Sequence, residues 1–371
     1  MSKAITKKHR EPLFHIAKRA DMIWWKAWLI RLVTIVVAVV LTGMLSMVVT
    51  DTPLGDVFNT MFRGTFGRLL EGNFRLFWQF LQKTAILLCL SLAVTPAFKM
   101  KFWNCGAEGQ ALIGGLSAMV CMMQIGDKVP NAVLVAIVVV ASIVSGAVWG
   151  LIPAIFKAYY NTNETLFTLM MNYVATQIVA YYVYLTGQGS GIIQPVSTGN
   201  LPVIGNQPYL LNILIVTVLM VAMFIYLKYS KQGYEIAVVG ESQNTARYIG
   251  INVKKVILRT MLISGALCGV AGMLLVAGTD HSINTNTVGG QGFTAIMVSW
   301  LGQFNPYIMA FMSALLTFLK SGAAKLADAN FLNSSYADIV SGIVILCLVG
   351  CEFLIRYKLM FRHTKKEGEN A

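Results

Sequence analysis

The sequence predicts an all-α, polytopic membrane protein, and three observations support that fold class. Of 371 residues, 56% are hydrophobic and only 12% are charged, whereas a soluble domain carries about 25% charged residues. Uncharged apolar runs about as long as a bilayer-crossing helix recur along the chain. These runs do not alternate apolar and polar residues, as the strands of an outer-membrane barrel would. Because only helices satisfy their own backbone hydrogen bonds inside lipid, we expect helical spans rather than a soluble enzyme or a disordered chain.

Residues 1–27 are expected to form a cytoplasmic and interfacial segment before the first span. The segment is basic, but the apolar run that follows is too long for a cleaved signal peptide, and no small-residue cleavage site follows that run. Trp24, Trp25 and Trp28 suit the headgroup region, where a short amphipathic helix would lie on the membrane. The first span is predicted over residues 32–49.

Residues 28–356 form the predicted transmembrane permease domain, with about ten segments. After the first span, the others are predicted at residues 79–98, 102–125, 132–156, 166–185, 209–227, 260–279, 291–303, 306–324 and 339–355. The segment at 102–125 is interrupted by glycines, and the segment at 291–303 is too short to cross a bilayer by itself. Residues 357–371 are predicted to form a cytoplasmic tail.

The excess of Lys and Arg predicts the orientation of the chain. There are 29 Lys and Arg against 16 Asp and Glu, a net charge of +13. Residues 1–26 hold seven of the basic residues, residues 228–259 hold six and residues 356–371 hold five, whereas residues 187–208 hold none. By the positive-inside rule, both termini and the loop at 230–256 face the cytoplasm, and no nucleic-acid partner is needed to explain the charge.

The interrupted and the short segments resemble each other, which predicts an inverted repeat. Residues 104–115 read Asn-Cys-Gly-Ala-Glu-Gly-Gln-Ala-Leu-Ile-Gly-Gly, and residues 289–300 read Gly-Gly-Gln-Gly-Phe-Thr-Ala-Ile-Met-Val-Ser-Trp. Each is followed by a Pro next to an Asn and by a long apolar helix with a Ser-Gly pair. The two run in opposite directions in the predicted topology, so spans 2–5 match spans 7–10. Gly-rich breaks at matching places indicate a transport pathway, but glycine also permits close helix packing, and both interpretations stay open.

Polar residues at the first break are candidates for lining such a pathway. Glu108 is the one carboxylate in this part of the N-terminal repeat, and a charge inside the membrane is energetically costly. Gly106 and Gly109 flank it, so we expect the helix to be unwound nearby. Asn104 and Gln110 add hydrogen-bond donors and acceptors. Glu108 either shapes the pathway or braces the broken helix by accepting backbone N–H bonds.

Other residues within the spans point to binding and packing. Asn172, in the fifth span, is suited either to contact a substrate or to form an interhelical hydrogen bond. The six cysteines lie in apolar stretches and the four histidines are scattered, so we predict no metal site.

The cytoplasmic loop at 230–256 contains a predicted helix of about two turns. Ser242 is suited to cap its start and Gly250 to end it. A short capped helix between two long spans is typical of a docking surface for a partner. The sequence contains no Gly-x-x-x-x-Gly-Lys-Ser/Thr loop for binding nucleotide phosphates. Coupling to ATP would therefore require another chain.

Five segments together resemble the permease subunits of bacterial ATP-binding cassette (ABC) importers for nucleosides and simple sugars, of the branched-chain and ribose-like type. Residues 104–110 are similar to that family's Asn-Ile-Gly-Ala-Glu-Gly-Gln. Residues 163–175 are similar to its Asn-Glu-Val-Ile-x-Thr-Ile-Met-Leu-Asn-Tyr-Ile-Ala, and residues 240–251, 264–272 and 292–296 complete the set. The Gly-Ala-Glu-Gly form resembles the nucleoside branch. Cys105 replaces Ile beside the expected pathway, which leaves the solute open, and Ser242-Gln243 replaces the usual Asn-Pro of the coupling loop.

The resemblance implies a function and two sets of site residues. The implied substrate pathway includes Asn104, Glu108, Gln110, Asn172, Phe293 and Thr294. The implied ATPase-coupling residues are Gly240, Glu241, Ala246, Arg247, Tyr248 and Gly250. The chain would be a non-catalytic subunit that moves a nucleoside or related small sugar-containing solute by alternating access. It would bind no cofactor, because ATP and Mg²⁺ are used by the partner ATPase.

The implied assembly lies in the bacterial cytoplasmic membrane. It contains a cytoplasmic ABC ATPase, a second and related but different permease chain, and a substrate-binding lipoprotein. The alternative is a self-sufficient, ion-coupled secondary transporter, which inverted repeats fit equally well. That class needs a membrane-embedded carboxylate pair or an ion site, and only Glu108 is in place. An intramembrane enzyme would need paired catalytic residues such as Ser and His, and no His lies within a confident span.

Overall fold

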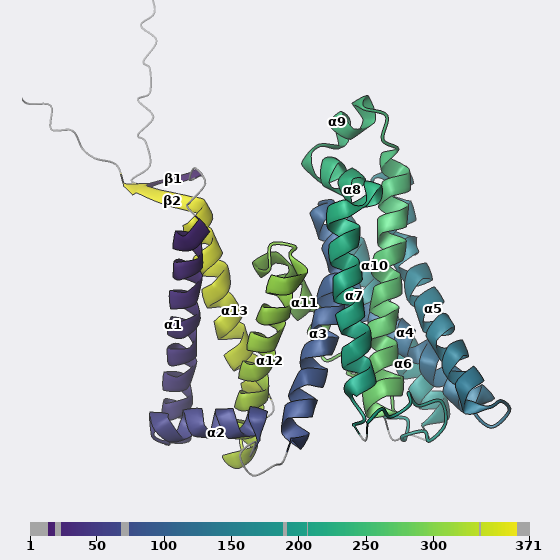
Figure 1. Cartoon of the computed structure of the whole chain (residues 1–371), viewed down its shortest axis with the longest axis horizontal. Helices are drawn as coiled ribbons and strands as arrows, with labels where there is room; N and C mark the ends of the chain where they lie inside the picture. The colour runs from purple at the N-terminus through teal and green to yellow at the C-terminus, as the bar shows by residue number, and fades with distance from the viewer. Residues whose placement is uncertain are drawn as a thin grey trace, which may run out of the picture. The chain divides into compact units, whose positions relative to one another are not determined.

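A computed structural model describes residues 14–18, 24–67, 74–187, 191–205, 207–333 and 335–361 (Figure 1). The chain divides into two compact units, one formed by Met1–Phe58 with Asp338–Ala371 and the other by Asn59–Ala337. In chain order the described elements are β1 (Phe14–Lys18), α1 (Trp24–Thr50), α2 (Leu54–Phe66), α3 (Arg75–Lys99), α4 (Ala107–Ile125), α5 (Asn131–Tyr160), α6 (Glu164–Thr186), α7 (Leu210–Tyr229), α8 (Lys231–Glu241), α9 (Gln243–Tyr248), α10 (Val253–Leu275), the π-helical turn η2 (Val276–Asp280), α11 (Gln291–Leu301), α12 (Pro306–Ala329), α13 (Ser335–Arg356) and β2 (Tyr357–Phe361).

The smaller unit joins the two ends of the chain. Arg31 on α1 and Glu352 on α13 form an ion pair with an Nε–Oε1 distance of 2.7 Å. β1 and β2 are antiparallel, with Phe14 opposite Phe361. This short pairing departs from the predicted all-helical chain, and no local pattern in either five-residue segment predicts it. The three tryptophans expected in a separate interfacial helix belong instead to the start of α1, which begins at Trp24.

All ten predicted segments are helical in the structure. Eight described helices are long and apolar enough to cross a membrane: α1, α3, α5, α6, α7, α10 with η2, α12 and α13. The other two segments are α4 and α11, which correspond to the interrupted and the short segment. The prediction of a polytopic helical membrane protein is therefore confirmed. The amphipathic helix α2 was not predicted; it buries Val57 and Met61 and exposes Phe62.

The larger unit is built around α3 and α10, which are the most deeply buried of its spanning helices. α10 packs against α4 and α5, whereas α3 packs against α11 and α12. α3 begins the first predicted repeat and packs on the second and third segments of the second repeat, α11 and α12. α10 begins the second repeat and packs on the second and third segments of the first repeat, α4 and α5. This reciprocal packing fits the two-fold relation that the predicted inverted repeat implies.

Glycines set the separation between α10 and its neighbours. Gly269 lies against the backbone of Ser142 and Gly146 on α5, and Gly272 lies against the backbone of Ala111 on α4. A Cβ atom at either glycine would overlap those backbones. The glycines of the motif at 264–272 therefore serve close helix packing, as small residues do in membrane bundles.

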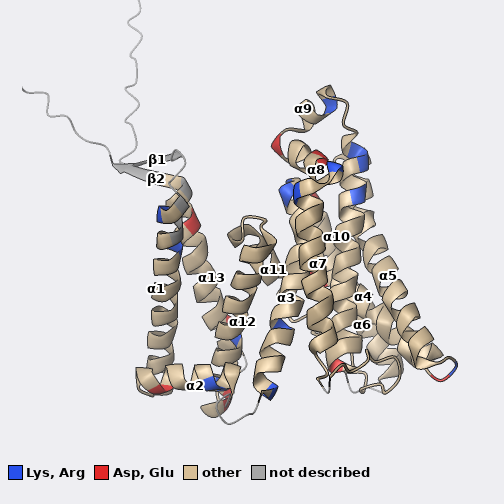
Figure 2. Ribbon diagram, in the orientation of Figure 1, with Lys and Arg blue, Asp and Glu red and all other residues tan. Residues whose placement is uncertain are grey.

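The two ends of the larger unit differ in charge. α8 and α9 lie at the same end as the start of α10 (Figure 1), and Lys and Arg gather there (Figure 2). The loop at 191–205 lies at the opposite end and contains neither Lys nor Arg. By the positive-inside rule, the end that carries α8 and α9 is the one predicted to face the cytoplasm.

Candidate translocation site

The first break in the bundle lies between α3 and α4, where residues 100–106 are not helical. Asn104 is buried there, and its Nδ2 donates to Oγ of Ser264 on α10 at 3.0 Å. Its Oδ1 accepts from Nε2 of Gln110 at 3.1 Å, and its Nδ2 also donates to Oε1 of Gln110 at 3.3 Å. The side-chain amides of Asn104 and Gln110 therefore hold each other in place, and Asn104 also connects the break to α10. Ser264 lies about 16 Å along α10 from its first residue, so the break is near the middle of that helix.

Glu108 joins the two repeats at this depth. The N–H of Gly290 donates to its Oε1 at 2.8 Å, and the N–H of Gly292 donates to its Oε2 at 2.8 Å. Both donors belong to the start of α11, whose N-cap residue, Gly290, has no side chain to cap it. The carboxylate takes the place of that cap, and its charge suits the positive end of the α11 dipole. We call this arrangement the Glu108 clasp.

The chain is unwound near Glu108, as expected, but the non-helical residues all precede the carboxylate. α4 is helical from Ala107, with Gly106 as its N-cap residue, so the break precedes the carboxylate. One expected role for Glu108 is to brace its own broken helix by accepting backbone N–H bonds. It accepts such bonds, but they come from the start of α11 in the other repeat. Gly292 permits this contact, since a Cβ atom there would overlap the backbone of Glu108.

Asn172 on α6 closes the first break from another side. Its Nδ2 donates to the carbonyl oxygen of Cys105 at 2.8 Å, and its Oδ1 accepts from the N–H of Gly109 at 2.9 Å. Oγ1 of Thr168, one turn earlier on α6, accepts from the N–H of Cys105 at 3.2 Å. Of the two roles predicted for Asn172, the structure shows the interhelical hydrogen bond.

Phe293 and Thr294 lie in the first turn of α11, beside the clasp. Oγ1 of Thr294 donates to the carbonyl oxygen of Gly290 at 3.4 Å. The Phe293 side chain is 45% exposed, which makes it the most exposed of the six predicted pathway residues. The six therefore form two groups: the amides of Asn104, Gln110 and Asn172 hold the first break, whereas Glu108, Phe293 and Thr294 surround the start of α11.

An aromatic cluster next to the break was missed by the sequence analysis. Trp103 stacks on Trp300 with ring centroids 5.5 Å apart, and Phe98 packs edge-on against both rings. Trp103 lies within the first break and Trp300 lies in α11, so one tryptophan in each broken segment was the available signal. The cluster gives the two breaks a second contact besides the clasp.

One face of α6 is also exposed and was missed. Tyr173, Gln177 and Tyr181 follow one another at helical spacing and, with Val174 and Ile178, line a shallow hollow of about 460 Å³. Tyr173 and Tyr181 are 71% and 65% exposed. The surface of this hollow is apolar. An exposed apolar face on a spanning helix is suited to contact lipid or a second chain.

The predicted coupling helix is present as α9. Oγ of Ser242 accepts from the N–H of Thr245 at 3.2 Å, which confirms the predicted cap. Gly250, at φ +83°, follows the end of the helix as predicted. Arg247 and Tyr248 project from it, and the Tyr248 side chain is 93% exposed. The neighbouring Glu241, at the end of α8, is exposed as well.

α8 and α9 are connected to the first break by packing. Ala246 is fully buried in a hydrophobic cluster that contains Met100 and Phe102, both within the non-helical residues 100–106. Gly240 lies against the carbonyl oxygen of Lys99, where a Cβ atom would overlap it. A displacement of α8 and α9 would therefore reach the segment that leads into Asn104 through this cluster. Within the described residues, no group of three or more His, Cys, Asp or Glu side chains is placed to hold a metal ion.

Comparison with known proteins places the whole bundle in a family. The profile of the family described as "Branched-chain amino acid transport system / permease component" matches residues 76–349. The guanosine ABC transporter permease protein NupP of Bacillus subtilis is 28% identical over 355 residues, which cover 92% of this chain and 98% of that protein. The glucose ABC transporter permease protein TsgB13 of Haloferax volcanii is 26% identical and covers 90% of both chains.

A third relative is the nucleoside ABC transporter permease protein NupB of Lactococcus lactis. It is 25% identical over 81% of this chain and 88% of its own length. Both nucleoside transporters have a second matching permease in the same organism, NupQ and NupC. These full-length similarities do not favour a self-sufficient secondary transporter. The broken helices, the docking helix and the family profile agree, and the chain belongs to the permease-component family as the membrane-spanning permease subunit of an ABC importer.

Proposed function

We propose that the chain carries a nucleoside, or a related small sugar-containing solute, by alternating access in an ATP-driven importer. The observation that carries the mechanism is the Glu108 clasp, because two short helices from opposite repeats begin at one carboxylate near mid-bundle. Breaks of this kind at matching places in two repeats are typical of transport pathways. The solute class is supported by relatives named for guanosine and nucleoside transport, with one relative named for glucose.

In this proposal the chain itself is non-catalytic and binds no cofactor. A separate cytoplasmic ATPase uses ATP and Mg²⁺ and docks on α9 through the exposed Arg247 and Tyr248. When the ATPase closes, it moves α9, and the buried Ala246 passes that movement to Met100 and Phe102. The first break then shifts, and the clasp makes α4 and α11 move together.

A second, related permease chain completes the pathway in this proposal. Bacillus subtilis has two guanosine permease proteins that match this chain, NupP and NupQ, and Lactococcus lactis has NupB and NupC. The exposed face of α6, with Tyr173, Gln177 and Tyr181, is the surface that contacts this second chain. A substrate-binding lipoprotein delivers the solute at the end that carries the loop at 191–205. Both termini face the cytoplasm of a bacterial cell.

The test is uptake together with isolation of the complex. The tagged full chain is purified from its own host in mild detergent, and the uptake of labelled guanosine, ribose and leucine is compared between the parent strain and a deletion strain. We expect an ATPase and a second permease to co-purify, and guanosine uptake to fall in the deletion strain while leucine uptake does not. A chain that purifies alone and mediates solute flux in proteoliposomes without ATP would contradict the proposal.

A further inference from the structure

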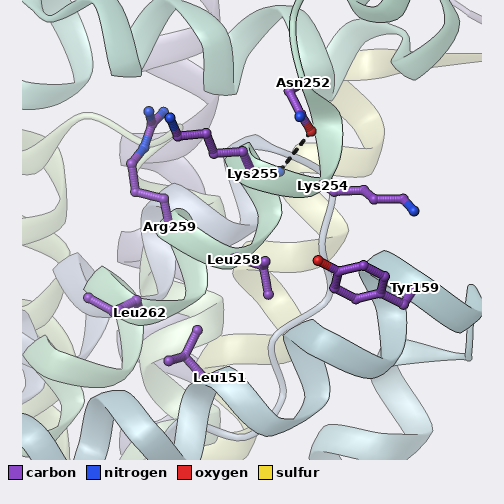
Figure 3. Close-up of a pocket in the computed structure, with 8 residues that line it drawn as sticks. All are labelled: Leu151, Tyr159, Asn252, Lys254, Lys255, Leu258, Arg259 and Leu262. Atoms are coloured by element: carbon purple, nitrogen blue, oxygen red, sulfur yellow. Dashed lines mark hydrogen bonds between the residues drawn. The ribbon is translucent and has the colours of Figure 1, made fainter.

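A groove runs between α5 and α10 at the end that carries α8 and α9 (Figure 3). It encloses about 310 Å³ and is not part of the candidate translocation site. Its lining consists of Leu151 and Tyr159 on α5, Asn252 just before α10, and Lys254, Lys255, Leu258, Arg259 and Leu262 on α10. The lining contains three basic residues and no acidic one.

Two of the basic residues, Lys255 and Arg259, lie together on one side of the groove, whereas Lys254 points away from them toward Tyr159 (Figure 3). Lys254 lies over the ring of Tyr159, with its Nζ 4.7 Å from the ring centroid. Lys255 and Arg259 are one helical turn apart, and Figure 3 shows their charged ends on the same side of the groove. Arg259 pairs with Glu235 on α8 at 3.0 Å, and both Lys255 and Arg259 also line an adjoining hollow with Lys231. The groove and the adjoining hollow together contain four basic residues and one carboxylate, so the local charge is positive.

The rest of the groove is apolar and continues along the spanning part of the helices. Leu258 and Leu262 lie one turn apart on α10, and Leu151 lies two turns from Tyr159 on α5. Leu262 is 42% exposed and Tyr159 is 60% exposed, so the groove opens outward. Leu262 is about 10 Å along α10 from Lys255. The lining is therefore cationic at the end next to α8 and apolar about 10 Å further along α10.

We infer that this groove binds an anionic phospholipid. The phosphate lies beside Lys255 and Arg259, Lys254 adds positive charge at the opposite edge by Tyr159, and an acyl chain lies along the three leucines. A zwitterionic lipid carries its own cation beside the phosphate and so gains less from the three basic residues, and a free phosphate ion would make no use of the apolar floor. Basic pockets between spanning helices on the cytoplasmic side are suited to anionic headgroups. The inference requires only that the end with α8 and α9 faces the inner leaflet, and it does not depend on which solute is carried.

The test is lipid titration of the delipidated full chain in mild detergent, followed by native mass spectrometry. Phosphatidylglycerol and phosphatidylcholine are compared on the unaltered chain, on the double variant Lys254→Gln/Lys255→Gln, and on the matched control Lys101→Gln/Lys228→Gln. The control removes the same charge at the same end, outside the groove. We expect the pocket variant to bind phosphatidylglycerol at least about tenfold more weakly, since each basic residue near a headgroup contributes measurably. The control should bind within about twofold of the unaltered chain.

Three further measurements test whether the acyl chain is needed, whether a headgroup alone competes, and whether the variants remain folded. A third variant, Leu262→Asn, keeps every charge and should also weaken phosphatidylglycerol binding. Glycerol 3-phosphate, which has the headgroup chemistry without acyl chains, should not displace the lipid. The thermal unfolding midpoint of each variant should match that of the unaltered chain, since the substituted lysines are exposed.

Several results would overturn the inference. If the control Lys101→Gln/Lys228→Gln lost as much phosphatidylglycerol binding as the pocket variant, the binding would be general charge attraction and not a site. If the unaltered chain bound phosphatidylcholine as tightly as phosphatidylglycerol, the basic residues would not select an anionic headgroup. Displacement by glycerol 3-phosphate would indicate a phosphate site instead of a lipid site. Unchanged lipid binding in the pocket variant, with lost co-purification of the ATPase, would make this groove a protein-docking surface.

Discussion

At the scale of single residues, Glu108 determines how α11 begins. Its two carboxylate oxygens accept hydrogen bonds from two backbone N–H groups at the start of α11. No side chain at the N-cap of α11 caps that end of the helix. Hydrogen bonds to a charged group contribute about 1.5–3 kcal/mol, and more is lost when buried donors are left unpaired. The residue is thus structural, and in the proposed mechanism it also makes the two broken helices move together.

We predict that Glu108→Ala lowers the free energy of unfolding by about 2–3 kcal/mol and abolishes most uptake. Glu108→Gln should be intermediate, because its amide oxygen still accepts from one glycine while its NH₂ group faces the other donor. Thermal unfolding of the detergent-solubilised chain and solute uptake in cells are the two measurements. Asp328→Asn is the control, since that carboxylate is 72% exposed and pairs only loosely with Lys325. Unfolding midpoints and uptake that are the same in Glu108→Gln as in the unaltered chain would show that the clasp has neither role.

At the scale of elements, α9 is a rigid, capped helix whose two faces differ. Ala246 is buried against the segment that leads into the first break, whereas Arg247 and Tyr248 project outward. The outward side chains are therefore free to bind a partner without disturbing the packing beneath them.

We expect Arg247→Ala and Tyr248→Ala to uncouple transport: the assembled transporter should still hydrolyse ATP, but solute uptake should fall several-fold. The chain should unfold at an unchanged temperature, because both side chains are exposed. Gln243→Ala, an exposed position at the start of the same helix, is the matched control and should leave uptake unchanged. Normal uptake and normal ATPase association in both variants would remove α9 as the docking surface.

The sequence predicted the long helices well and the short elements poorly. The eight long segments were recognised because an extended apolar run has one structural solution in lipid, whereas α4 and α11 were recognised from their Gly-rich motifs. α2 and α8 are amphipathic and short, so their apolar residues do not form a run. The polar residues of the first break were found from their motif, but their partners were not. Glu108 and Gly290 are 182 residues apart, and no local pattern reveals such a contact.

At the scale of the whole molecule, the larger unit has a basic end and an uncharged loop at the other end. The positive-inside rule then gives one orientation, with α8 and α9 in the cytoplasm and the loop at 191–205 outside.

We predict that Ser197→Cys is labelled by a membrane-impermeant maleimide in intact cells, whereas Asn244→Cys is labelled only after the cells are opened. Both positions are exposed in the structure, so a difference between them reports the side of the membrane. The unaltered chain, with its native cysteines, supplies the background. Labelling of Asn244→Cys in intact cells would reverse the orientation.

The Glu108 clasp also bears on the ancestry of the chain. A duplicated unit would begin with two equal halves, each able to stabilise its own broken helix. Here only the first half contributes a carboxylate, and the matching stretch of the second half offers Gly290-Gln291-Gly292 as donors. Loss of either half would leave the other with an uncapped helix or an unpaired anion. The two halves are therefore interdependent at this contact, because each supplies what the other lacks.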